Sequence, residues 1–251
     1  MNKFDACTCL IPGKILEFLP GTPSLYPGIA DEAYLRGSKY NPVSEGHVLY
    51  DPFCGIGGAS ISPSIIRRSG IAQIFGSDMD AEALTIARRN FSLTDVASYE
   101  TATDGGTKAP NGKEVDPALL TQFRDMLLHY GCTAPVSLRL FRHAMPLPVP
   151  SEIIAAETVS MVITDPPYGQ MSAFMESENG QPAQSDALLE KYVESLSAIR
   201  PLLRKEATVT VICDRRQKLE GLLAGIPEYK YRETKKSKGQ NFRHFHTLQA
   251  T

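Results

Sequence analysis

The sequence has no apolar stretch long enough to cross a membrane, and it carries little net charge. The formal net charge is −2 over 251 residues, so any contact with nucleic acid must come from local basic clusters. The N-terminus lacks the charged-then-apolar layout of a signal peptide. We therefore expect a cytoplasmic protein with no membrane partner.

Cysteine is also scarce, with five residues whose odd number and spacing indicate no disulfide framework. Cys7 and Cys9 have no second ligand pair at the spacing of a zinc site, so we expect no metal. Free thiols are typical of a reducing compartment. The remaining composition, 42% hydrophobic and 22% charged, is that of a globular protein, and we expect one domain over residues 1–251.

What the chain does contain is a sharp break after a short apolar run at residues 159–163, which predicts a buried strand. The run is followed by Asp165-Pro166-Pro167-Tyr168. Two consecutive prolines remove two backbone N–H donors and leave two carbonyl acceptors on a stiff backbone. With an acid before them and an aromatic ring after, the loop can hold the exocyclic amine of a base. The alternative is an ordinary proline-rich turn.

A second motif lies upstream, where a predicted strand at residues 47–50 runs into a glycine turn and then a predicted helix at residues 59–68. The turn reads Asp51-Pro52-Phe53-Cys54-Gly55-Ile56-Gly57. Strand, glycine turn and helix are the layout of a nucleotide-binding first crossover. Glycine lets the backbone approach a ligand closely, and Pro63 is expected near the start of the helix.

The next predicted strand, residues 71–76, leads to a further acid at the position where dinucleotide folds bind ribose. This acid is Asp78, and Asp80 is a good N-cap for a predicted helix at residues 81–90. Met79 would flank a bound adenine or fill the core. For Asp78 the alternatives are a second capping residue or a surface turn.

The rest of the chain alternates predicted helices and strands. An N-terminal cap segment, residues 1–45, combines an irregular or strand-like stretch at 1–24 with a helix at 29–40. An insertion, residues 98–131, combines a loop at 98–116 with an amphipathic helix at 117–130. Then follow a strand at 136–141, a helix at 151–157, a polar stretch at 170–184, a helix at 185–203, a strand at 208–213, and strands at 229–234 and 243–248 joined by a basic tip at 235–240.

This alternation predicts an α/β fold of the Rossmann-like, doubly wound kind. We expect a mostly parallel seven-stranded sheet with a C-terminal antiparallel hairpin and an inserted helical segment. Ligands of such sheets bind at the carboxyl ends of the strands. Asp51, Asp78, His143, Asp165 and Asp214 all fall there.

The glycine turn, the acid at Asp78 and the Asp165 loop, in this order, resemble the Rossmann-like S-adenosylmethionine-dependent amino-methyltransferases over roughly residues 25–216. The layout resembles the ribosomal RNA guanine methyltransferases in particular, namely the avilamycin-resistance family of 23S rRNA guanosine methyltransferases. The resemblance implies S-adenosylmethionine as cofactor and RNA, ribosomal in this family, as partner. The oligomeric state and the methylated nucleotide stay open.

The resemblance also implies roles for single residues. Asp51, Pro52, Phe53, Cys54, Gly55 and Gly57 would hold the methionine part of the cofactor, Asp78 the ribose and Met79 the adenine. Asp165, Pro166, Pro167 and Tyr168 would hold the target base, and Asp165 would also contact the cofactor. Related enzymes often place an acid near position 143 to bind the adenine amino group. Here the residue is His143, so that cofactor contact is an open question.

Basic side chains near the expected active-site rim are the candidates for RNA binding. They are Arg215, Arg216 and Lys218 after one strand and Lys235, Lys236 and Lys238 at the hairpin tip, with Arg67, Arg68, Arg88 and Arg89 as weaker candidates on predicted helices. Other functions also fit the motifs: a DNA or tRNA amino-methyltransferase, a non-catalytic RNA-binding scaffold, or a nicotinamide dehydrogenase. The dehydrogenase would need a third spaced glycine, which is missing.

Overall fold

The computed structural model describes residues 8–20, 25–103, 114–166, 185–214, 219–237 and 243–251, except for the side chains of 185–189. Seven strands form one sheet in the order β3-β2-β1-β4-β5-β7-β6. They are β1 (His47–Asp51), β2 (Ile71–Asp78), β3 (Ser137–Arg142), β4 (Val159–Thr164), β5 (Leu203–Asp214), β6 (Tyr229–Lys236) and β7 (Arg243–Ala250). Strands β1 to β5 are parallel, whereas β7 is antiparallel to both β5 and β6. The predicted Rossmann-like fold is confirmed.

The helices are mostly those that the sequence predicts. They are α1 (Pro27–Tyr40), α2 (Gly58–Ile66), α3 (Ala81–Phe91), α4 (Val96–Ala102), α5 (Pro117–His129), α6 (Ser185–Ile199) and α7 (Glu220–Ala224), with 3-10 turns η1 (Thr8–Leu10), η2 (Arg68–Gly70) and η3 (Arg200–Leu202). The Asp80 carboxylate caps α3 by accepting from the amides of Glu82 and Ala83. Helix α5 begins with Pro117 in its first turn, and the chain leaves it through Gly131 at φ +68°.

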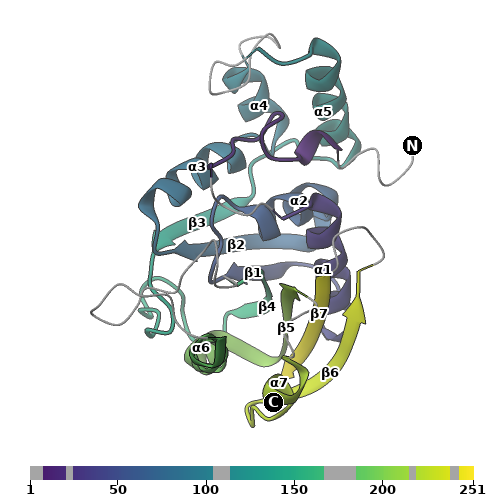
Figure 1. Cartoon of the computed structure of the whole chain (residues 1–251). Helices are drawn as coiled ribbons and strands as arrows, with labels where there is room; N and C mark the ends of the chain where they lie inside the picture. The colour runs from purple at the N-terminus through teal and green to yellow at the C-terminus, as the bar shows by residue number, and fades with distance from the viewer. Residues whose placement is uncertain (1–7, 21–24, 104–113, 167–184, 215–218, 238–242) are drawn as a thin grey trace.

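The core has two sides because side chains along each strand alternate between the faces of the sheet. Leu49 of β1 packs on one side with α1 and α2, whereas its neighbour Tyr50 packs on the other side with α6 and α7. Figure 1 shows α4 and α5 at one end of the molecule, beside the N-terminal segment that holds η1. Helix α1 belongs to the predicted cap segment and lies over β4, β5 and β7. The cap segment and the insertion remain predictions as separate parts of the domain.

Two predicted segments differ from the structure. Residues 98–102 form the end of α4 instead of a loop, and 104–113 lie outside the described residues. The helix has only seven residues, but Val96, Tyr99 and Ala102 pack on the core, Asp95 caps it, and Tyr99 stacks on Phe123 at 5.1 Å between centroids. The predicted helix at 151–157 is wrong: the segment consists of turns and a bend, and it ends in a left-handed conformation at Glu157, with φ 54°.

Smaller differences concern the bounds of elements. Pro63 lies inside α2 and not near its start. Helix α6 ends at Ile199, just before Pro201, and β5 begins at Leu203, five residues before the predicted strand. Helix α7 has five residues, too few for a visible period, and was not predicted. In the described part of residues 1–24, η1 and turns replace the predicted strand-like pieces, and 170–184 lie outside the description.

Candidate active site

Four carboxylates follow the carboxyl ends of neighbouring parallel strands. Asp51 is the last residue of β1, Asp78 of β2 and Asp214 of β5, while Asp165 directly follows β4. Because β1 lies between β2 and β4, and β4 lies beside β5, these acids line one edge of the sheet. The strand order reverses at β1, which is where ligands bind in open α/β sheets. The edge is therefore acidic and suited to a cationic ligand.

Asp51 is the most deeply buried of these acids, with 1% of its surface exposed. Its Oδ1 accepts a hydrogen bond from the Phe53 amide at 3.2 Å, whereas its Oδ2 is buried without a hydrogen-bond partner among the described residues. Burial raises the pKa of Asp51 to about 8. Hydrogen bonds from the Phe53 amide and the Thr164 side chain oppose the rise, and the charges of Asp78 and Asp165 add to it. A buried acceptor of this kind is stabilised by an incoming cation.

The two glycines of the turn after β1 have different surroundings. Gly57 has φ +96°, and a Cβ there would lie 2.7 Å from Ile61 Cδ1 and 3.0 Å from the Phe91 ring. Gly55 has φ +50°, and a Cβ there would meet no atom of the described residues within 4 Å. Gly57 is thus required by packing and backbone conformation, while Gly55 borders open space beside the acidic edge.

Asp78 links the glycine turn to the end of β2. Its Oδ2 accepts from the Gly55 amide at 2.8 Å and its Oδ1 from the Asp80 amide at 2.9 Å. Burial raises its pKa, and these two amide hydrogen bonds oppose the rise. Asp78 is therefore held at the edge, next to the glycine turn, where the sequence analysis places the ribose.

Met79 and His143 lie next to Asp78. The Met79 carbonyl accepts from Arg142 Nε at 3.0 Å, and the Asp78 carbonyl accepts from the His143 amide at 2.9 Å. The His143 ring is half-buried, and its Nε2 donates to the Leu147 carbonyl at 2.8 Å, which commits one ring nitrogen. Contacts of Met79 and His143 with the cofactor remain predictions.

Asp165 and Pro166 begin the loop after β4, whereas Pro167 and Tyr168 lie outside the described residues. Asp165 Oδ1 is buried without a hydrogen-bond partner in the described parts of the chain. Burial raises the pKa of Asp165 to about 7, and the positive charge of Arg243 opposes the rise. Pro52, Phe53 and Pro166 share a small pocket with α6, so the glycine turn and the loop meet.

The predicted RNA-binding residues fall into two groups. Arg215, Arg216, Lys218 and Lys238 lie outside the described residues. Lys235 and Lys236 are exposed, but they belong to strand β6 and not to the hairpin tip, because pairing with β7 continues to Lys236. Their role in RNA binding remains a prediction.

Sequence reasoning missed Arg243 as a residue of this edge. It is the first residue of β7 and pairs in register with Asp214, the last residue of β5. This register places Arg243 close enough to Asp165 to act on its pKa. The available signal was that the predicted hairpin strand at 243–248 begins with the cation Arg243, and that the predicted strand at 208–213 leads directly to the acid Asp214.

The described ranges contain no group of three or more His, Cys, Asp or Glu side chains that could hold a metal ion. Within the same ranges, no helix is both long enough and apolar enough to cross a membrane.

The raised pKa values predict that the stability of the ligand-free protein depends on pH. Above its ordinary pKa of 3.8, each buried carboxyl keeps a proton that the unfolded chain releases, so stability is lost as the pH rises through about 7 for Asp165 and about 8 for Asp51. His246, whose pKa burial lowers to about 4 from 6.5, acts in the opposite direction at lower pH. The free energy of unfolding should therefore fall between about pH 6.5 and 8.

Urea unfolding at fixed ionic strength measures this dependence. Asp51→Asn removes the titrating group with the higher pKa and should flatten the upper part of the profile. A wild-type stability that rises across this range would show that the two carboxyls are ionised in the folded protein.

Comparison with known proteins identifies relatives of this chain. Residues 7–105, which include the glycine turn and Asp78, match the model of a family described as rRNA methyltransferase AviRa. The 23S rRNA (guanine(2535)-N(1))-methyltransferase of Streptomyces viridochromogenes is 26% identical over 213 residues, which are 82% of this chain and 80% of that protein.

Solved structures show the same fold. A structure of rRNA methyltransferase AviRa from Streptomyces viridochromogenes superposes with a TM-score of 0.69 at 20% identity, covering 99% of this chain and 93% of that one. A methyltransferase from Pyrococcus furiosus superposes with a TM-score of 0.56 at 14% identity, with the same coverage of 99% and 93%. The chain thus has the Rossmann-like methyltransferase fold, and in sequence and structure it resembles the AviRa rRNA methyltransferases.

Proposed function

We propose that this protein is an S-adenosylmethionine-dependent methyltransferase that methylates a guanine of ribosomal RNA. The observation that carries the proposal is the acidic edge, where Asp51, Asp78 and Asp165 surround a glycine turn with open space at Gly55. The relative from Streptomyces viridochromogenes, named for methylation of a 23S rRNA guanine at N1, supports the substrate.

The edge fits this cofactor chemically. S-adenosylmethionine carries an ammonium group, a ribose diol and, on its sulfonium, the methyl group that it supplies in activated form. Asp51 would attract the ammonium end, because its Oδ2 is a buried acceptor without a partner among the described residues. Asp78 would accept from the ribose hydroxyls, and Gly55 leaves room for the ligand to approach the backbone.

Asp165 would act on the base. If the target is ring nitrogen N1, the N1–H bond must break as the bond from N1 to the methyl carbon forms, and the bond from that carbon to sulfur breaks. Asp165 would take the N1 proton, since a carboxylate with a pKa of about 7 is well matched to proton transfer near neutral pH. If the target is the exocyclic amine, Asp165 would chiefly hold its hydrogens and orient the lone pair.

Calorimetry with S-adenosylmethionine tests the cofactor assignment. We expect one site per chain, and Asp78→Ala should weaken binding by about 1.5–3 kcal/mol because a hydrogen bond to a charged group is lost. The matched control is Asp80→Ala, which removes the neighbouring exposed acid that caps α3. This control should lower helix stability but leave affinity intact. Equal affinity of the wild type and Asp78→Ala would refute the ribose-binding role.

A further inference from the structure

Most of the arginines considered for RNA binding have structural partners instead. Arg67 forms two hydrogen bonds to the Asp31 carboxylate, at 2.7 and 2.9 Å, and Arg89 forms two to Glu17, at 2.6 and 2.7 Å. Arg68 and Arg88 donate to backbone carbonyls. Bidentate pairs of this kind hold the guanidinium in place, so these side chains tie helices to the body of the protein.

A different set of cations comes together where α1 lies beside the C-terminal hairpin. We call it the α1–β6 strip, and its members are Arg36, Lys39, Arg232, Lys235 and Arg243. Two carboxylates, Glu32 and Glu233, are bonded to members of the strip. The strip is therefore locally cationic in a chain whose net charge is −2.

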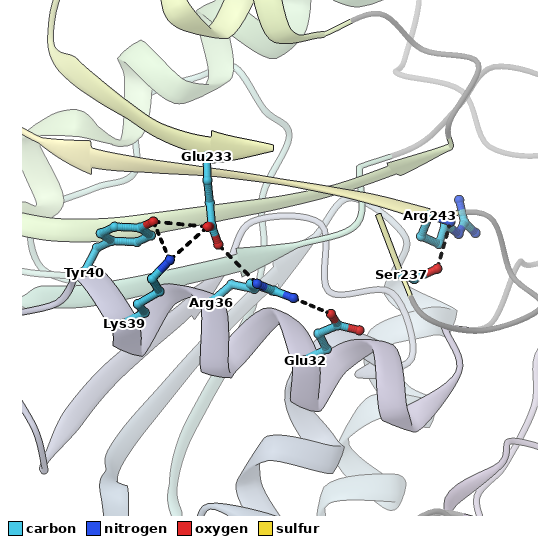
Figure 2. Close-up of polar contacts among 7 residues, drawn as sticks. All are labelled: Glu32, Arg36, Lys39, Tyr40, Glu233, Ser237 and Arg243. Carbon is cyan, nitrogen blue, oxygen red and sulfur yellow. Dashed lines mark hydrogen bonds and ion pairs between the residues drawn. The ribbon is translucent and has the colours of Figure 1, made fainter. Parts of the chain in front are cut away.

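Glu233 anchors the α1 part of the strip. Its side chain is only 9% exposed and accepts from Lys39 Nζ at 3.0 Å, Arg36 Nη1 at 3.4 Å and the Tyr40 hydroxyl at 3.1 Å (Figure 2). Burial raises the pKa of Glu233, but the hydrogen bonds from Lys39 and Tyr40 outweigh it and leave the pKa lowered. Glu233 thus orients both cations, while Glu32 adds a second carboxylate at 2.8 Å from Arg36 Nη2, so the excess positive charge of the strip comes from Arg232, Lys235 and Arg243.

Tyr40 adds an aromatic surface to the strip. Lys39 Nζ lies 4.6 Å and Arg232 Cζ lies 5.7 Å from the centre of its ring. The side chain of Lys39 is 54% exposed, so its ammonium group is held at the surface and remains open to a further anion.

The strip continues toward the active-site edge. Phe245 of β7 packs in the same core cluster as α1, so its side chain lies on the α1 face of the hairpin. Lys235 pairs with Phe245 across the hairpin, and Arg243 lies two residues before Phe245 on β7, so both share this face. Lys235 is exposed and has no hydrogen-bond or ion-pair partner among the described residues. Figure 2 shows the order across the view from Tyr40 through Lys39 and Arg36 to Arg243.

We propose that the α1–β6 strip binds the phosphate backbone of the RNA substrate and leads it to Asp165. The proposal rests on the proposed function, since it takes RNA to be the substrate. Cations on one helix and two strands, aligned toward an active site, fit a polyanion of regular charge spacing. Arg243 ends the strip at the edge, where it pairs with Asp214 and acts on Asp165.

The test is the salt dependence of binding to a large-subunit ribosomal RNA transcript. The variant Lys39→Gln/Lys235→Gln removes two charges and leaves Arg36 and Glu233 untouched. Its log–log slope of affinity against salt should be smaller than that of the wild type by roughly 1.4–1.8, or about 0.7–0.9 for each lost phosphate contact. S-adenosylmethionine affinity should not change.

Lys14→Gln is the control, because Lys14 is an exposed lysine of the N-terminal segment and lies outside the strip. An unchanged slope in the double variant, or an equally reduced slope in the control, would refute the proposal that the strip binds the RNA phosphates. If the wild type methylates the RNA in that case, the proposed function still stands. A wild type that neither binds nor methylates the RNA would refute both proposals. If the strip bound anionic phospholipid vesicles and not RNA, its assignment as an RNA-binding surface would be wrong.

Discussion

Asp165→Asn is expected to lower the rate of methyl transfer to ribosomal RNA by about a hundredfold or more while cofactor affinity and fold are retained. The amide has nearly the shape of the carboxylate but cannot take up a proton. If the methylated atom is N1 of guanine, as in the name of the Streptomyces viridochromogenes relative, the reaction loses its base. Incorporation of tritiated methyl groups into unmethylated ribosomal RNA measures the loss.

Two further variants separate the loss of a base at Asp165 from other effects of the substitution. Asp165→Ala should be at least as impaired, because it also removes the hydrogen-bond acceptor. Asp116→Asn makes the same chemical change at the cap of α5, away from the edge, and should retain activity because asparagine also caps helices. Substantial activity of Asp165→Asn beside an inactive Asp165→Ala would indicate positioning of an exocyclic amine. Wild-type turnover by Asp165→Ala would show that the loop after β4 is only structural.

Gly57→Ala is expected to destabilise the protein by about 1–3 kcal/mol, because alanine is strained at a left-handed backbone position. At φ +96° the new methyl group would also lie 2.7 Å from Ile61 Cδ1 and 3.0 Å from the Phe91 ring. The Ile61 side chain of α2 or the Phe91 ring of α3 must then shift, and both helices flank the turn that we assign to the cofactor. Urea unfolding measures the stability, and calorimetry measures the loss of cofactor affinity that follows from a displaced turn.

Gly55→Ala is the matched variant for this prediction. Its φ of +50° lies in the left-handed region that non-glycine residues can reach, and the added Cβ meets no atom within 4 Å in the part of the chain that the structure describes. We expect a smaller loss of stability than for Gly57→Ala, together with weaker cofactor binding because the methyl group occupies the open space at the edge. If Gly55→Ala were as unstable as Gly57→Ala and bound the cofactor normally, the assigned roles of the two glycines would be wrong.

Local patterns in the sequence determined most of the fold. The apolar run before Asp165 is β4, the alternating residues after position 228 form the hairpin, and Pro117 and Gly131 bound α5 as predicted. The positions of Asp51, Asp78 and Asp165 at strand ends also followed from the sequence, because parallel strands direct their carboxyl ends to one edge. Where elements were too short for a clear local pattern, as in the seven-residue helix α4 and the five-residue helix α7, the prediction was wrong or absent.

The tertiary structure alone decided which polar groups are partnered. Lys39 and Glu233 are 194 residues apart in the chain, and Arg67 reaches Asp31 across 36 residues, so no local pattern reveals either pair. The buried oxygens of Asp51 and Asp165 that lack a hydrogen-bond partner among the described residues are likewise visible only once neighbouring strands surround them. The physical reason is that periodicity reports only which face of an element is buried. Whether a carboxyl is ionised, and whether a lysine has an ion-pair partner, depends on groups that packing brings close from elsewhere in the chain.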